Sequence, residues 1–253
     1  MTAIFKREFL SFFRSPVGYV AIALFSFLSG FIFYSQFSNH IVNIGSEVIS
    51  LREFFVILVP IVTMGLLSED KKRGTDILYY TTPVSLFNVV IGKVLAAFAL
   101  FAIMFINVII HIIVTLCCGG MFGVGAIGTI IVFFFMAFMF ISMGLFASAI
   151  TDNQIVSAIV SFIMILVTQL LSRFGEYAGT AVTSVLSSIK VGSAVSIGNG
   201  INSIIRWFDP FLKTQDFRLG IFSVSALFFL VSIGLLFLYL TFRVLDKKRW
   251  SQA

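Results

Sequence analysis

The sequence predicts an all-α polytopic membrane protein with six transmembrane helices. Of its 253 residues, 59% are hydrophobic and only 11% are charged, and the mean hydropathy is +1.09. A water-soluble domain of this length needs far more charge to stay dispersed. The basic residues cluster at the ends of apolar runs, where they meet anionic lipid, so we expect no nucleic-acid partner. We predict one transmembrane domain over residues 1–253.

The N-terminal segment, residues 1–15, has the pattern of an amphipathic helix that lies at the membrane surface. Apolar residues form one face and basic residues another, and the proline at position 16 ends the helix before the first span. Internal charges make the segment unlike a secretory signal peptide. The residues expected to define this interfacial helix are Lys6, Arg7, Phe9, Phe12 and Arg14.

Six further segments have the length and apolar character of a membrane span, which needs about 20 residues. They are Val17–Phe37, Phe54–Leu67, Val89–Leu116, Ala126–Ile150, Ile155–Leu171 and Leu219–Phe242. The second is short and carries Pro60. We expect no charged side chain inside any span beyond its end turns.

Lysine and arginine gather before the first span, between the second and third, and after the sixth. The short loops of the other side carry only Arg52. By the positive-inside rule, both termini are therefore expected in the cytosol. The same rule places residues 68–88 in the cytosol and the longer segment 172–218 outside.

Residues 68–88 are charged and helix-forming, and they lie between two apolar runs. Glu69 with Arg73 and Lys72 with Asp76 are opposite charges four residues apart, which support a helix. We expect this helix to continue to Pro83. It is either a solvated connector or a docking helix for a cytosolic partner, and the pattern favours docking.

The exported segment 172–218 carries two apolar patterns with helical spacing, at Val182–Val191 and Ile201–Phe208. Asp209-Pro210 ends the second. We predict two short helices that dip toward the membrane without crossing it, packed on protein because irregular backbone exposed to lipid is too costly.

No catalytic or metal-binding motif stands out. The sequence contains no H-E-x-x-H, no G-x-S-x-G and no phosphate-binding loop of the G-x-x-x-x-G-K-[ST] type. We therefore predict that the chain is not an enzyme, that it binds no cofactor or metal, and that any ATP it uses is bound by another chain.

A polar stripe follows one face of the third span. Asn107, His111 and Thr115 are spaced four residues apart, and Gln169 lies in the fifth span. They form either the wall of a translocation path or hydrogen bonds between helices, which contribute about 0.6 kcal/mol each. Helix packing is favoured. Two pairs of small residues, Ser26 with Gly30 and Gly144 with Ser148, also indicate close helix contacts.

Three stretches resemble the membrane subunit of ABC exporters of the ABC-2 permease family. Phe5–Val20 (FKREFLSFFRSPVGYV) is similar to that family's interfacial elbow helix, and Met64–Lys93 (MGLLSEDKKRGTDILYYTTPVSLFNVVIGK) to its coupling segment. Phe237–Trp250 (FLYLTFRVLDKKRW) resembles its last span and basic terminus. Within the family, the likeness is nearest to permeases associated with gliding motility or with maturation of nitrous-oxide reductase.

The resemblance implies a multi-pass permease in the cytoplasmic membrane of a prokaryote, which exports an unidentified substrate. It also implies a second permease subunit, identical or related, and two cytosolic ABC ATPase subunits that bind ATP and Mg²⁺. By resemblance, the residues that dock on the ATPase are Glu69, Lys72, Arg73, Gly74, Thr75 and Leu78. A membrane scaffold or assembly factor that transports nothing is the alternative, and an intramembrane enzyme or ion-coupled carrier is a third.

Overall fold

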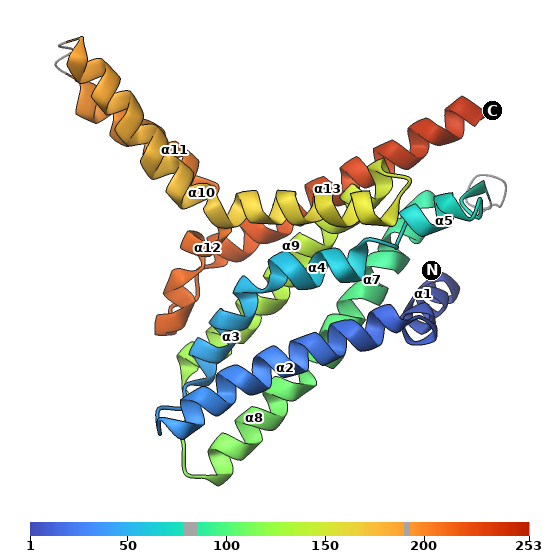
Figure 1. The fold of residues 1–253 in the computed structure, drawn as a ribbon, viewed down its shortest axis with the longest axis horizontal. Coiled ribbons are helices and arrows are strands. Elements are labelled where there is room, and N and C mark those ends of the chain that lie inside the picture. Colours follow the sequence, from blue (N-terminus) through green and yellow to red (C-terminus); the bar gives the residue numbers. More distant parts are fainter. Residues whose placement is uncertain (78–84, 190–192, 253) are drawn as a thin grey trace.

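Every regular element in the described part of the chain is a helix. The computed structural model describes residues 1–77, 85–189 and 193–252. Within them, five helical segments are long and apolar enough to cross a bilayer, and a bent helix pair makes a sixth when it counts as one span. The predicted class, an all-α polytopic membrane protein, is confirmed. Both chain termini and helix α5 lie on the same side of the molecule, here termed the N-terminal end (Figure 1).

Helices α1 (Thr2–Arg14) and α2 (Pro16–Ser38) are separated by a single residue. Ser15 has an extended backbone (φ −108°, ψ 158°), and Pro16 occupies the first turn of α2, where its missing N–H would have no partner. On α1, the rings of Phe5 and Phe9 stack with centroids 5.7 Å apart. The expected amphipathic helix and first span are therefore both present, and the chain changes direction between them.

When the bent helix pair counts as one span, the second span begins at Ile44 and not at Phe54. Helix α3 (Ile44–Glu53) meets the segment Phe55–Lys72, which begins with α4 (Phe55–Thr63), at an angle of 58°. The hydrophobic pattern did not predict α3 because this helix carries three charged residues. Glu47 is 0% and Arg52 is 7% exposed, so a span that includes α3 holds two buried charges, contrary to the expectation that no charge lies inside a span. Both are tolerated because polar side chains from distant parts of the chain bind them.

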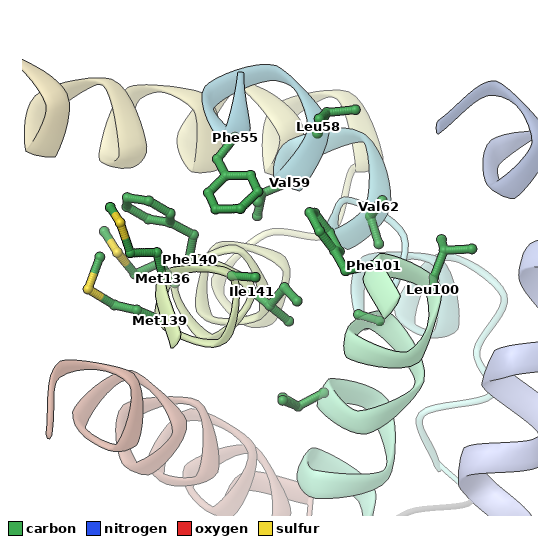
Figure 2. Close-up of a cluster of buried hydrophobic side chains, with 14 of the residues drawn as sticks. Phe55, Leu58, Val59, Val62, Leu100, Phe101, Met136, Met139, Phe140 and Ile141 are labelled. Atoms are coloured by element: carbon green, nitrogen blue, oxygen red, sulfur yellow. The ribbon is translucent and has the colours of Figure 1, made fainter. Parts of the chain in front are cut away.

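The core lies where α4 and α7 (Leu86–Met104) pack against α9 (Val124–Ile150). Helix α7 continues, after a break at Phe105, into α8 (Ile106–Cys117), and the two form the third span. In Figure 2 the side chains of Phe55, Val59 and Phe101 point toward α9. The ring of Phe55 lies 5.6 Å from that of Phe101 and 5.9 Å from that of Phe140. Since lipid tails are as apolar as these rings, close packing holds the bundle together.

The fifth span continues far beyond its predicted end. Helix α10 (Gln154–Ser188) has 35 residues, a length of about 52 Å at 1.5 Å per residue, whereas the apolar core of a bilayer is about 30 Å thick. Helix α11 (Ala194–Trp207) runs back along it, and Figure 1 shows this hairpin projecting from the bundle. The predicted short helix at Val182–Val191 is therefore wrong: those residues, as far as Ser188, are the last turns of α10.

Two short elements connect the hairpin to the last span. Asp209 begins α12 (Pro210–Lys213) by accepting hydrogen bonds from the backbone N–H groups of Phe211 (2.8 Å) and Leu212 (3.2 Å). The 3₁₀ helix η1 (Gln215–Leu219) follows, and α13 (Val224–Gln252) packs along α9. Arg52 of α3 donates to Thr214 Oγ1 over 3.0 Å. The bend of the second span is thus connected to the segment that leads into the sixth.

Candidate functional site

The candidate site is built around helix α5 (Ser68–Lys72), at the N-terminal end of the bundle. A helix of five residues leaves most of its backbone groups without partners of its own. Ser148 of α9 supplies hydrogen-bond partners for the backbone groups at the start of α5. Its Oγ accepts hydrogen bonds from the N–H groups of Leu67 and Ser68, each 2.9 Å long, and donates to the carbonyl of Met64 over 3.1 Å. Helix α5 is therefore positioned by a side chain from another helix.

Helix α5 ends at Lys72, and Arg73 and Gly74 follow it in the arrangement known as a Schellman motif. Gly74 has φ +68°, a conformation that side chains disfavour. The N–H of Gly74 bonds to the carbonyl of Lys71, and the N–H of Thr75 to that of Asp70. The expected continuous helix from Glu69 to Pro83 is therefore wrong at Gly74. The prediction failed because favourable charge spacing cannot compensate for a left-handed glycine.

A buried group of charges connects α5 to α1 and α7. Lys93 of α7 is 0% exposed. Its Nζ lies 2.6 Å from Asp70 Oδ2 and 3.1 Å from Glu8 Oε1, and it also donates to the carbonyl of Leu66. Arg7 Nη2 lies 3.8 Å from the same oxygen of Asp70. A buried ammonium is tolerated only when it is paired and hydrogen-bonded, so these contacts hold three elements in one arrangement.

On its other side, α5 is bonded to the end of α9. Lys71 Nζ donates to the carbonyls of Ala149 and Thr151, the latter over 3.0 Å, and it lies 3.4 Å from Asp152 Oδ1. Lys248 of α13 lies 3.4 Å from the same oxygen. A cation near the carboxyl end of a helix is favourable because its last carbonyl groups are unpaired. Helix α5 is thus connected to α1, α7 and α9, and through Asp152 to α13.

The pKa of the Asp152 carboxyl depends on these two lysines. Burial by itself would raise the pKa of its carboxyl, but the ammonium groups of Lys248 and Lys71 hold the pKa below its ordinary value. A pKa lowered in the folded state means that the contact stabilises the fold at pH values above the carboxyl's unfolded pKa and weakens as the pH falls through the folded one. The effect is small, because the side chain of Asp152 is 77% exposed.

The residues expected to dock on a partner lie together along α5 and the turn after it. Glu69 pairs with Arg73, and Thr75 donates to Asp70 Oδ1 over 3.1 Å. Lys72, Arg73 and Gly74 are exposed. Leu78 lies outside the described residues. Within α1, Lys6, Arg7 and Arg14 are exposed, whereas Phe9 is half-buried and Phe12 is buried. A groove of about 430 Å³ separates α1 from α5, and Arg7, Arg14, Glu69 and Arg73 contribute to its lining.

The polar stripe of the third span faces other helices of the same chain. Asn107 donates to Ser26 Oγ over 2.7 Å, and His111 Nδ1 lies 2.7 Å from Glu47 Oε1. Thr115 donates to the carbonyl of His111. Gln169 lies apart from this stripe and donates to the carbonyl of Glu53 over 2.7 Å. Each of the four therefore has a partner within the subunit.

Sequence reasoning missed the residues that hold α5 in place. Glu8, Asp70 and Lys93 are separated by up to 85 positions in the chain, and none of the three was predicted to hold this segment in place. One feature of the sequence could have indicated this buried group. Lys93 lies two turns inside a long apolar helix, at a depth where an ionisable group requires a partner.

We expect Ser148→Ala to lower the free energy of unfolding by about 1 kcal/mol, as the loss of a helix cap does. The substitution leaves the N–H groups of Leu67 and Ser68 without this partner. Ser142→Ala is the matched control, because Ser142 is equally buried on α9 but bonds only to its own helix, at Phe138. The measurement is the unfolding midpoint of the purified protein in detergent, and equal effects of the two variants would contradict the capping role.

Comparison with known proteins identifies the family. The family model described as "ABC-2 family transporter protein" matches residues 2–250, nearly the whole chain. A search of curated proteins found no match. The match extends from α1, through the α5 site and all candidate spans, to the last turns of α13. The chain is therefore a multi-pass membrane protein that belongs to the ABC-2 transporter family.

Proposed function

We propose that the chain is the permease subunit of an ABC exporter, and that it converts ATP hydrolysis by a separate ATPase into movement of its membrane helices. In this proposal ATP and Mg²⁺ are bound by the partner, and the exported substrate crosses the cytoplasmic membrane of a prokaryote. The exposed side of α5 and of the turn that follows it receives the ATPase. The docking residues proposed within the described chain are Glu69, Lys72, Arg73, Gly74 and Thr75.

One observation carries the proposal: α5 is exposed on one side and bonded to the bundle on the others. Ser148 and Lys71 connect it to α9, and Asp70 connects it to Lys93 of α7. A docked ATPase that pushes on α5 would therefore displace α7 and α9 together rather than bend a flexible loop. Packed interfaces of this kind shift between discrete arrangements as rigid bodies.

The charge distribution supports a cytosolic location for α5. Lys6, Arg7, Lys72, Arg73 and the basic residues at the end of α13 all belong to the N-terminal end of the bundle. An excess of lysine and arginine in short segments next to the spans marks the cytosolic side. Both termini and the docking surface would then face the ATPase, with α1 along the inner leaflet.

A second permease subunit, identical or related, completes the proposed transporter. Large apolar side chains are exposed on α2, among them Phe27, Phe31 and Tyr34, which are 64–70% exposed. Lipid or the second subunit would cover this face in the membrane.

The test compares two glycines that both have a left-handed backbone conformation. Gly74 and Gly119 have φ +68° and +81°, and a Cβ at either would meet nothing within 4 Å. Gly119 follows α8, at the opposite end of the bundle. We expect Gly74→Asp to weaken binding of the ATPase at least about tenfold, which is about 1.4 kcal/mol, and to abolish stimulation of its ATP hydrolysis. Gly119→Asp should leave both unchanged.

The readouts are co-purification with a cytosolic ABC ATPase from the same organism and the rate at which that ATPase hydrolyses ATP in liposomes. If Gly74→Asp and Gly119→Asp behave alike, the docking surface is wrong. A chain that purifies without any ATPase, or whose partner hydrolyses ATP equally without it, would favour the alternative of a membrane scaffold or assembly factor.

A further inference from the structure

A second group of buried polar side chains lies inside the spans, away from α5. Glu47 of α3 and His111 of α8 meet with 2.7 Å between Oε1 and Nδ1. Ser29 of α2 donates to the same oxygen of Glu47 over 2.8 Å. The ring of Phe33 stacks on the imidazole with centroids 4.1 Å apart. The side chain of Glu47 is 0% exposed and that of His111 is 15% exposed, so the bundle shields the pair from the lipid or water outside it.

In the described part of the chain, the helices packed against α3 and α8 bring no other charge to the pair, because Lys93 of α7 bonds to Asp70 and Glu8 instead. Helices α2, α4 and α9 contain no lysine, arginine, aspartate, glutamate or histidine, and His111 is the only such residue of α8. Tyr19 and Tyr34 of α2 and Cys117 of α8 are the remaining titratable groups of these helices. On α3 itself, Arg52 and Glu53 lie more than one helical turn from Glu47. Arg52 bonds to Thr214 and not to the pair.

The other carboxylate oxygen, Glu47 Oε2, is buried and has no hydrogen-bond partner. A fully charged carboxylate with one bare oxygen is costly in an apolar bundle, whereas the carbonyl oxygen of a neutral carboxylic acid is much less so. Within the described residues, no group of three or more histidine, cysteine, aspartate or glutamate side chains gathers to hold a metal ion. The missing partner is therefore best explained by a proton within the pair.

We infer that Glu47 and His111 form a proton-binding site that holds one shared proton inside the spans. With one proton, the pair is either a carboxylic acid beside a neutral imidazole or a carboxylate beside an imidazolium. Both forms are neutral overall, and they differ only in where the proton lies between Oε1 and Nδ1. A second proton would leave a net positive charge and loss of the proton a net negative one, and the apolar surroundings oppose both.

The site joins the bent second span to the third span. Glu47 belongs to α3, and movement of α3 away from α8 would separate Oε1 from Nδ1. The group that keeps the proton would then exchange it with any water that entered. Proton occupancy is thereby linked to the position of α3, so a change in one shifts the equilibrium of the other.

The bridging proton can be observed directly by nuclear magnetic resonance of the full chain in detergent micelles, with labelled histidine. The sequence has two histidines, and the other, His40, is exposed, so His40→Gln assigns the signals. We expect a far-downfield proton signal from the pair at pH values on both sides of neutrality. Glu47→Gln should abolish it. Glu53→Gln, the same change on the same helix without contact to His111, should preserve it.

The inference would be overturned if the wild-type chain lacked the downfield signal, or if the signals of His111 changed with pH in step with those of His40. Should Glu47→Gln fail to fold, the wild-type spectra at the two pH values still decide the question. None of these measurements requires the ATPase, so the outcome is independent of the proposed function.

Discussion

Lys93→Met is expected to lower the free energy of unfolding by about 3–5 kcal/mol, the usual loss when one partner of a buried ion pair is removed. The side chain of Lys93 is fully buried, and its Nζ contacts Asp70, Glu8 and the carbonyl of Leu66. Methionine preserves most of the volume of the lysine stem but leaves two carboxylates close together without this cation. Denaturation of the purified protein in detergent measures the change.

Lys72→Met is the control for Lys93→Met. Lys72 lies on α5 itself but is exposed, and surface substitutions of this kind change stability by no more than about 0.5 kcal/mol. Neutralising the carboxylates as well, in Lys93→Met with Glu8→Gln and Asp70→Asn, should recover part of the loss, because no buried carboxylate is then left without the lysine that paired with it. If Lys93→Met alone were as stable as the wild type, the buried cluster would not hold α1, α5 and α7 together.

Gly144→Ala is expected to destabilise the bundle by about 1–3 kcal/mol, the cost of overpacking a dense core. Gly144 of α9 faces Thr63 of α4. A Cβ at this position would lie 2.2 Å from Thr63 Oγ1 and 2.8 Å from its Cβ, so the two helices would have to separate. The unfolding midpoint in detergent measures the loss, and the same displacement would disturb Ser148, one turn further along α9.

Gly30→Ala is the matched control on α2, because a Cβ at Gly30 would meet nothing within 4 Å. Alanine favours a helix over glycine by up to about 1 kcal/mol, so this variant should be as stable as the wild type or more stable. Thr63→Ala combined with Gly144→Ala should recover part of the loss. Similar losses from Gly144→Ala and Gly30→Ala would show that glycine flexibility, and not the contact with Thr63, matters.

The hydrophobic pattern was sufficient to predict the membrane class and most spans, because each span is a continuous stretch of the chain. It failed at α3, where Glu47 and Arg52 interrupt the pattern although both are buried. It also failed at α10, because the pattern changes where the expected span ends at Leu171 while the helix continues to Ser188. Hydropathy reports the average surroundings of a segment, whereas burial of a charge depends on one partner from another helix.

For the candidate site, the sequence indicated the correct segment but not how it is held. The charges of residues 69–76 and the glycine at position 74 mark a polar segment that ends in a turn, and both properties are local. Only the tertiary structure brings Ser148, Lys93 and Glu8 to α5, and only it pairs Glu47 with His111. The physical reason is that a buried polar group is stable only beside its partner, and the fold alone decides which distant residues become neighbours.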